Sequence, residues 1–164
     1  DYMRFLATQA KDKKPFYHHT EIGYNYRMSN VLAAIGVAQM EVIEERIKRT
    51  REVNKIYQKE IGDLFYSFQE ERETDRSNMW LTCALMKGEH KPEDLIAHLE
   101  KDNIEARRLW KPMHEQPVMQ GYKKYINGNS SLLFLQGICL PSGSDLTKQD
   151  MKRIIKSIKT FFKK

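Results

Sequence analysis

The strongest constraint on the fold is a long helical pattern from Ser29 to about Gly62, whose two halves differ in polarity. Ser29 can cap its start, because a serine hydroxyl accepts a free N–H of the first turn, and Gly62 can cap its end. The first half, VLAAIGVAQM, is apolar on nearly every side and needs cover. The second half, EVIEERIKRTREVNK, is highly charged, with acid-then-base pairs such as Glu44–Lys48. We therefore expect a helix that joins two domains, or a domain and a partner subunit.

After Gly62 the chain carries several shorter patterns. Pro92 favours the start of a helix, and Asn103 can end it in the left-handed conformation. The full prediction comprises strands at 78–86, 104–110 and 137–141, and helices at 92–102, 130–136 and 147–162. This order predicts an α+β domain with a small sheet and helices over one face.

The last predicted helix has the clearest local signals. Thr147 and Asp150 have the spacing of a capping box at its start. An apolar stripe at helical spacing follows, formed by Met151, Ile154, Ile155, Ile158, Phe161 and Phe162. By contrast, residues 1–20 show no clear periodic element and resemble the end of something already under way, so we expect the chain to be part of a longer protein.

Composition limits the classes of protein that this chain can represent. Its 164 residues are 40% apolar and 30% charged, which predicts one globular domain rather than a disordered segment. The longest apolar run, VLAAIGVA, is too short to cross a bilayer, and we find no signal peptide. Cys83 and Cys139 lack the spacing of a disulfide framework, so a reducing, cytoplasmic location is expected. The net charge of +6 suits an anionic ligand or partner without naming one.

Common catalytic and metal-binding motifs are missing from the sequence. The five histidines have no metal-ligand spacing, so no metal site is expected. Phosphate-cradling glycine loops and the nucleophile motif GxSxG are also absent. Nucleic-acid binding is disfavoured, since the aromatic residues do not alternate with basic residues on a strand.

The stretch GYNYR, residues 23–27, is the best candidate for binding. Asn25 offers two amide hydrogens and Arg27 a planar fork of donors, just before the N-terminus of the long helix. Donors at the positive end of a helix suit an anion such as phosphate. A structural alternative stays open, in which Tyr24 and Tyr26 pack and Arg27 forms a salt bridge.

Three segments, in order, resemble the DegT/DnrJ/EryC1/StrS family of sugar-nucleotide aminotransferases. They are HHTEIGYNYRMSNVLAAIGVAQMEVIEERIKRTREVNKIY, IEARRLWKPMHEQPV and GICLPSGSDLTKQDM, and together they cover nearly the whole chain. The resemblance implies a pyridoxal 5'-phosphate enzyme of the aspartate-aminotransferase (type I) fold. It also implies that the aldimine lysine lies upstream of GYNYR, outside this chain, which leaves no catalytic residue here.

The resemblance implies a division of the chain into three parts. Residues 1–28 lead out of a large cofactor-binding domain, residues 29–62 form the linking helix, and residues 63–164 form the small C-terminal domain. We therefore expect the chain by itself to be inactive.

The resemblance also implies roles for particular residues. Asn25 and Arg27 would bind the phosphate of the cofactor held by the partner subunit, in a homodimer formed through the GYNYR loop and the long helix. Arg108, Trp110 and His114 would lie near the sugar-nucleotide pocket, with Trp110 standing where a tyrosine is common.

The implied reaction moves an amino group, usually from glutamate, to a nucleotide-linked keto-sugar for glycan, polysaccharide or glycoprotein biosynthesis. The alternative from the residues alone is a non-catalytic α+β module that binds an anion or another protein. The sequence does not specify the sugar nucleotide or the carbon that is aminated.

Overall fold

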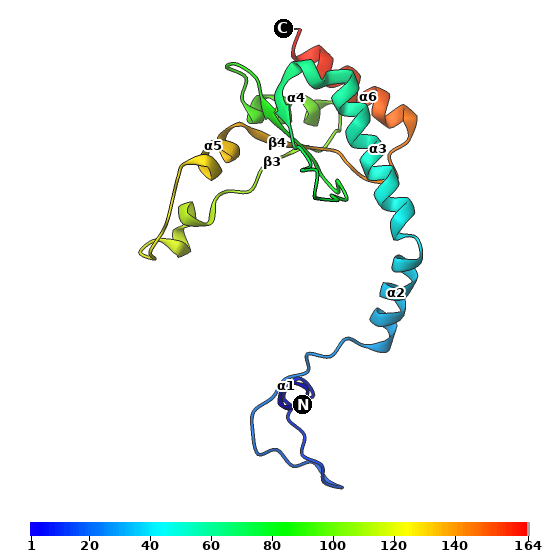
Figure 1. Ribbon diagram of the computed structural model, residues 1–164, viewed down its shortest axis with the longest axis vertical. Helices are drawn as coiled ribbons and strands as arrows, with labels where there is room; N and C mark the ends of the chain where they lie inside the picture. Colours follow the sequence, from blue (N-terminus) through cyan, green and yellow to red (C-terminus); the bar gives the residue numbers. More distant parts are fainter. Residues whose placement is uncertain (164) are drawn as a thin grey trace. The chain divides into compact units, whose positions relative to one another are not determined.

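The structure, a computed structural model, describes residues 1–163 (Figure 1). The chain divides into two compact units, Asp1–Ile43 and Glu44–Lys164. The boundary between these units therefore falls inside the segment that the sequence assigns to the linking helix.

The first unit contains two helices, α1 (Tyr2–Ala7) and α2 (Asn30–Glu41). The prediction that residues 1–20 hold no regular element is therefore wrong, because α1 is a short helix of six residues, too brief to show a period. The predicted cap of α2 is confirmed, since the Ser29 hydroxyl accepts a hydrogen bond from the Leu32 N–H at 3.3 Å.

The predicted continuous helix from Ser29 to Gly62 is observed as two helices. Val42 separates α2 from α3 (Ile43–Ile61), with φ −113° and ψ 5°. Its N–H bonds to the carbonyl of Gln39, three residues back, so the regular four-residue ladder is broken there. Gly62 keeps a negative φ and opens the 3₁₀ turn η1 (Gly62–Leu64), so it is not the predicted left-handed cap.

The second unit is built on a four-stranded antiparallel sheet with the order β1-β2-β4-β3. Its strands are β1 (Phe65–Phe68), β2 (Thr82–Met86), β3 (Arg107–Arg108) and β4 (Gly137–Leu140). The sequence predicted β4 well but gave β2 and β3 as longer strands and missed β1 altogether. β1 has only four residues and is defined by its pairing with β2.

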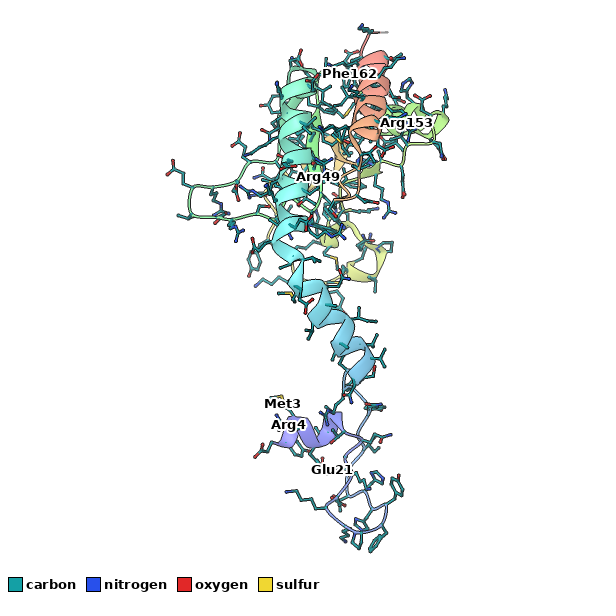
Figure 2. The ribbon with its side chains drawn as sticks, turned by 90° about the vertical axis from the view of Figure 1, so that its right-hand side faces the viewer. Met3, Arg4, Glu21, Arg49, Arg153 and Phe162 are labelled. Carbon is teal, nitrogen blue, oxygen red and sulfur yellow. The ribbon has the colours of Figure 1, made fainter. Side chains whose placement is uncertain are left out.

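Three helices, α3, α4 (Pro92–Lys101) and α6 (Lys148–Phe161), cover one face of this sheet. α3 and α6 lie side by side in both views (Figures 1 and 2). The core between the helices and the sheet contains Val53, Tyr57, Ile61, Ala84, Met86, Leu95, Leu99, Ile138, Leu140, Met151, Ile154 and Ile158. The predicted α+β class, with helices over one face of a small sheet, is confirmed.

Local signals in this unit are also confirmed. Asn103 ends α4 with a left-handed φ of 53°. The Thr147–Asp150 capping box starts α6, with both reciprocal hydrogen bonds present. Before α6, the Arg49 guanidinium of α3 donates to the Leu146 carbonyl at 2.5 Å, and Figure 2 shows Arg49 on the side of α3 that faces α6.

The segment between β3 and β4 is an arm that extends away from the sheet (Figure 1). It contains the 3₁₀ turns η2 (Met113–Glu115) and η3 (Pro117–Met119), and the predicted short helix, observed as α5 (Asn129–Gln136).

Candidate functional site

The GYNYR loop is held against α1 by its backbone. The Tyr24 N–H donates to the Leu6 carbonyl at 3.1 Å, and the Tyr26 N–H donates to the Ala7 carbonyl at 3.0 Å. Asn25, between them, forms an antiparallel bridge with Thr8. These backbone hydrogen bonds attach the loop to α1 without involving the side chains of residues 24–27.

Gly23 allows this close approach. A Cβ at this position would lie 2.5 Å from the Ala10 nitrogen and 2.7 Å from the Leu6 carbonyl oxygen. Both are backbone atoms that cannot rotate away, so every residue except glycine would push the loop off α1. The glycine of the motif therefore has a packing role.

The donors of the loop face solvent. Asn25 uses its side-chain oxygen to accept the Arg27 N–H at 3.3 Å, which leaves its amide hydrogens free. Among residues 1–163, neither the Asn25 amide nitrogen nor the Arg27 guanidinium forms a hydrogen bond or salt bridge, so the salt-bridge alternative for Arg27 gains no support within the described part of the chain. Tyr24 and Tyr26 are 62% and 79% exposed, so neither is a core residue of this chain. An exposed amide and an exposed guanidinium so close together suit an anion such as a phosphate group.

A second polar cluster closes the loop between α1 and GYNYR. The Asp12 carboxylate pairs with His18 Nδ1 at 2.6 Å and accepts a hydrogen bond from the Thr20 hydroxyl. The hydrogen bond with His18 is the main reason that the pKa of Asp12 is lowered. His19 turns to the carbonyl of Gln9 instead, at 2.9 Å, so the adjacent histidines do not share one ligand.

The second unit contains a cavity of about 360 Å³ at the edge of its sheet. Two exposed tryptophans, Trp80 and Trp110, lie beside it with their ring centroids 6.3 Å apart and their planes at 35°. They are 63% and 64% exposed. Such a pair of aromatic faces offers a stacking surface for a planar ring or for the apolar face of a sugar.

A half-buried ion pair between Arg51 and Glu71 positions the backbone before Trp80. The Glu71 carboxylate binds the Arg51 guanidinium through two hydrogen bonds of 2.8 and 2.7 Å, and it also accepts the N–H of Ser77. The Arg51 hydrogen bonds are the main reason that the pKa of Glu71 falls to about 2. Met79, which follows, has a positive φ of 48° and a buried side chain, so the chain turns sharply into Trp80.

Arg107 and Arg108, neighbours on β3, have different environments. Arg108 is paired with Glu93 of α4, donates to the Phe134 carbonyl at 2.6 Å and lies 4.1 Å from the Phe134 ring centroid. The Arg108 guanidinium therefore connects α4 to α5 and is already engaged by groups of both helices. The Arg107 side chain is 77% exposed and is hydrogen-bonded to Glu105, at 2.8 Å through Nε. Of the two arginines that line the cavity, Arg107 is the more exposed and the better placed to meet an anion from solvent.

His114 lies apart from the two tryptophans. Its Nε2 is 3.3 Å from the Ser131 hydroxyl at the start of α5, and 3.6 Å from a Glu115 carboxylate oxygen. These contacts tie η2 to α5. Of the three substrate residues expected in this unit, the structure brings Arg108 and Trp110 to one cavity and leaves His114 outside its lining.

The sequence reasoning missed Trp80 and Arg107. Trp80 lies in the stretch that was assigned entirely to a strand, although β2 begins only at Thr82. Arg107 precedes Arg108 directly, and side chains on a strand alternate between its two faces. That alternation was the available signal that the two arginine side chains have different surroundings.

The described part of the chain shows neither a metal-binding cluster nor a membrane-spanning helix. No group of three or more His, Cys, Asp or Glu residues among residues 1–163 could hold a metal ion. No helix within the same residues is long and apolar enough to span a membrane.

Comparison with protein families gives a match over residues 1–159 to the DegT/DnrJ/EryC1/StrS aminotransferase family. The chain is 40% identical, over 97% of its length, to EpsN of Bacillus subtilis, which is described as a pyridoxal phosphate-dependent aminotransferase. It is 35% identical, over 89% of its length, to the GDP-perosamine synthase of Escherichia coli O157:H7. The chain spans 42% and 40% of these two relatives.

Solved structures show the same fold. A DegT DnrJ EryC1 StrS aminotransferase from Brucella abortus matches 99% of this chain with a TM-score of 0.81, at 22% sequence identity. This chain covers 43% of that structure. The matched structure is therefore more than twice as long as this chain.

Proposed function

From the premise that this chain belongs to the DegT/DnrJ/EryC1/StrS aminotransferase family, we propose that it is the C-terminal part of a pyridoxal phosphate-dependent sugar-nucleotide aminotransferase. The proposed reaction transfers an amino group, usually from glutamate, to a nucleotide-linked keto-sugar in the cytoplasm. The names of the two curated relatives support both the cofactor and the sugar substrate class. Residues 1–28, 29–62 and 63–164 are proposed to be the exit from the large domain, the link and the small domain.

One observation carries the proposal at the level of residues. Asn25 and Arg27 are fixed by the backbone of their loop, directly before the capped start of α2, and no group among residues 1–163 accepts a hydrogen bond from their side-chain nitrogens. This donor set fits the phosphate of pyridoxal phosphate in hydrogen-bonding capacity and in charge. When bound, the cofactor supplies the electron sink that amino transfer requires. The chain's own contribution is to hold that phosphate and neutralise its charge.

The cavity beside Trp80 and Trp110 is proposed to hold part of the nucleotide-sugar. The tryptophan faces can orient a planar base or a sugar ring, and Arg107 can pair with a phosphate of the nucleotide. Arg108, which lines the same cavity, is proposed to act by positioning rather than by binding the substrate, because its guanidinium is held by Glu93 and Phe134.

A homodimer is proposed through the GYNYR loop and α2. The apolar residues of α2 are exposed within the single chain, among them Val31, Leu32, Ile35, Val37 and Met40. An apolar helix surface of this kind is normally covered by protein. A second subunit covering it would also receive the Asn25 and Arg27 donors at its cofactor.

The test uses the full-length enzyme that contains this chain. Asn25→Ala and Arg27→Ala should each weaken cofactor binding about tenfold or more, the scale of a lost hydrogen bond to a charged group. The measurement is the dissociation constant of pyridoxal phosphate, followed by its visible absorbance. Asn30→Ala is the matched control, because it removes an exposed amide five positions away on the first turn of α2. Unchanged cofactor affinity in both loop variants would refute the proposal that Asn25 and Arg27 bind the cofactor phosphate.

The chain by itself is proposed to be inactive. Incubated with pyridoxal phosphate, glutamate and a nucleotide-linked 4-keto-sugar, it should form no amino sugar. Turnover by the 164 residues alone would refute this. If the natural protein has this length and binds an anion, the non-catalytic module would be favoured instead.

A further inference from the structure

Cys83 and Cys139 lie directly opposite each other on the neighbouring antiparallel strands β2 and β4. Their sulfur atoms are 3.7 Å apart, and neither is in a disulfide. They are separated by 56 positions in the sequence, so no local sequence pattern predicts that they lie together. Nothing in the proposed amino-transfer chemistry uses either thiol.

The backbone defines the kind of pair they form. The carbonyl of Cys83 accepts a hydrogen bond from Gln69, beyond β1, so the peptide groups of Cys83 point away from β4. On the other side, β4 pairs Cys139 with Arg107 of β3. Cys83 and Cys139 therefore form a non-hydrogen-bonded antiparallel pair, in which Cα atoms are typically about 4.5 Å apart. That separation lies within the range that a disulfide can bridge, roughly 4.4–6.8 Å.

We propose that Cys83 and Cys139 are a redox-active dithiol, a modification site that closes into a disulfide between β2 and β4 on reaction with a small disulfide such as oxidised glutathione. Because the two strands are already held in register by the sheet, closure needs only a change in the side-chain torsions. The sulfurs lie on the face of the sheet opposite the core helices, so closure leaves the core packing in place.

In this proposal Cys139 is the attacking sulfur. A hydrogen bond from the Cys83 thiol is the main reason that the pKa of Cys139 is lowered; burial acts against this, and the positive charge of Arg107 adds to it. The pKa of Cys83 is raised, mainly because its proton is shared with Cys139. Cys139 also lines the cavity beside Trp110 and Arg107, through which a small oxidant can approach.

The reaction balances in two exchange steps. The Cys139 thiolate attacks one sulfur of glutathione disulfide, a protein–glutathione disulfide forms, and one glutathione leaves as its thiolate. The Cys83 sulfur, after loss of its proton, then attacks the Cys139 sulfur and releases the second glutathione. The protein loses two electrons and two protons, and the glutathione disulfide becomes two glutathione molecules.

The test is disulfide mapping of the purified protein. It is reduced, equilibrated in glutathione buffers of increasing oxidised fraction, quenched with N-ethylmaleimide and digested with trypsin without reductant. The expected product is peptide 77–87 joined to peptide 125–148, at a mass lower than their sum by two hydrogen atoms, with loss of both alkylation sites. The proposal is overturned if both thiols remain alkylated, or carry only separate glutathione adducts, at every ratio.

Cys83→Ser is the matched control. Without the resolving thiol, Cys139 should accumulate the glutathione adduct that the unaltered protein converts to the disulfide. A second readout is thermal unfolding, since a cross-link between distant positions restricts the unfolded chain. Oxidation should raise the Tm of the unaltered protein reversibly and leave that of Cys83→Ser unchanged. Because the mapping is done on the unaltered protein, its result stands even where the variant folds poorly.

Discussion

The Glu71 carboxylate forms a bidentate ion pair with the Arg51 guanidinium of α3, with N···O distances of 2.8 and 2.7 Å. Both groups also bind the backbone of Ser77. This pair connects α3 to the segment that leads into Trp80. It therefore links the stability of the second unit to the placement of one wall of its cavity.

The pair predicts a loss of stability in acid. The folded-state pKa of Glu71 is about 2, below its ordinary value of 4.5. Its stabilising contribution is therefore complete above about pH 4.5 and is lost as the pH falls toward 2. Glu71→Gln should lower the Tm at neutral pH, and the gap to the unaltered protein should close through this pH range. The exposed Glu73→Gln is the control, and an equal shift in both variants would contradict the prediction.

Gly23→Ala should detach the GYNYR loop from α1. The added methyl group would overlap backbone atoms of Ala10 and Leu6, at a cost of about 1–3 kcal/mol for overpacking. Hydrogen exchange of the Tyr24 and Tyr26 amides should become faster, because their bonds to α1 are lost. In Gly36→Ala, where no atom lies within 4 Å of the new Cβ, exchange at these amides should stay the same and α2 should become more stable.

Arg108→Ala should affect the stability of the protein, whereas Arg107→Ala should affect the binding of substrate. Removing Arg108 leaves Glu93 and the Phe134 carbonyl without their partner, so it should lower the free energy of unfolding by about 1–3 kcal/mol. Removing the exposed Arg107 should change stability by less than about 0.5 kcal/mol. In the full-length enzyme, Arg107→Ala should raise the KM for the nucleotide-sugar. Chemical denaturation and steady-state kinetics together separate the two effects, and a stability loss confined to Arg107→Ala would reverse the assignment.

Thr147→Ala should destabilise the second unit by about 1 kcal/mol, because it removes the hydroxyl that accepts the Asp150 N–H in the capping box of α6, while the backbone N–H of residue 147 stays. The hydrogen bond from the Thr147 side chain is also the main reason that the pKa of Asp150 is lowered, so this pKa should rise in the variant. Thr160→Ala, on the exposed last turn of α6, should be close to neutral. Urea unfolding of the two variants measures the difference.

Local signals in the sequence correctly identified several parts of the fold. The Ser29 cap, the left-handed Asn103 and the Thr147–Asp150 box each depend on atoms only a few residues apart, so spacing alone predicts them. The ordered motifs also gave the family, which the match over residues 1–159 confirms. The roles assigned to Asn25 and Arg27 remain predictions, although the structure keeps their donor groups exposed.

Other features depended on which segments meet in three dimensions. β1 exists because it pairs with β2, and Trp80 meets Trp110 although β4 lies between the strands that they flank, β2 and β3. The interruption at Val42 changed one predicted helix into two.

The sequence by itself determined three helix ends (Ser29, Asn103 and Thr147–Asp150), the α+β class and the family, because these depend on near neighbours and on ordered motifs. The tertiary structure alone decided that Arg108 is held by Glu93 while Arg107 faces the cavity, and that Cys83 lies opposite Cys139. The physical reason is strand register. A shift of one residue between β2 and β4, or between β3 and β4, would move every side chain to the other face of the sheet, and packing of the core sets that register.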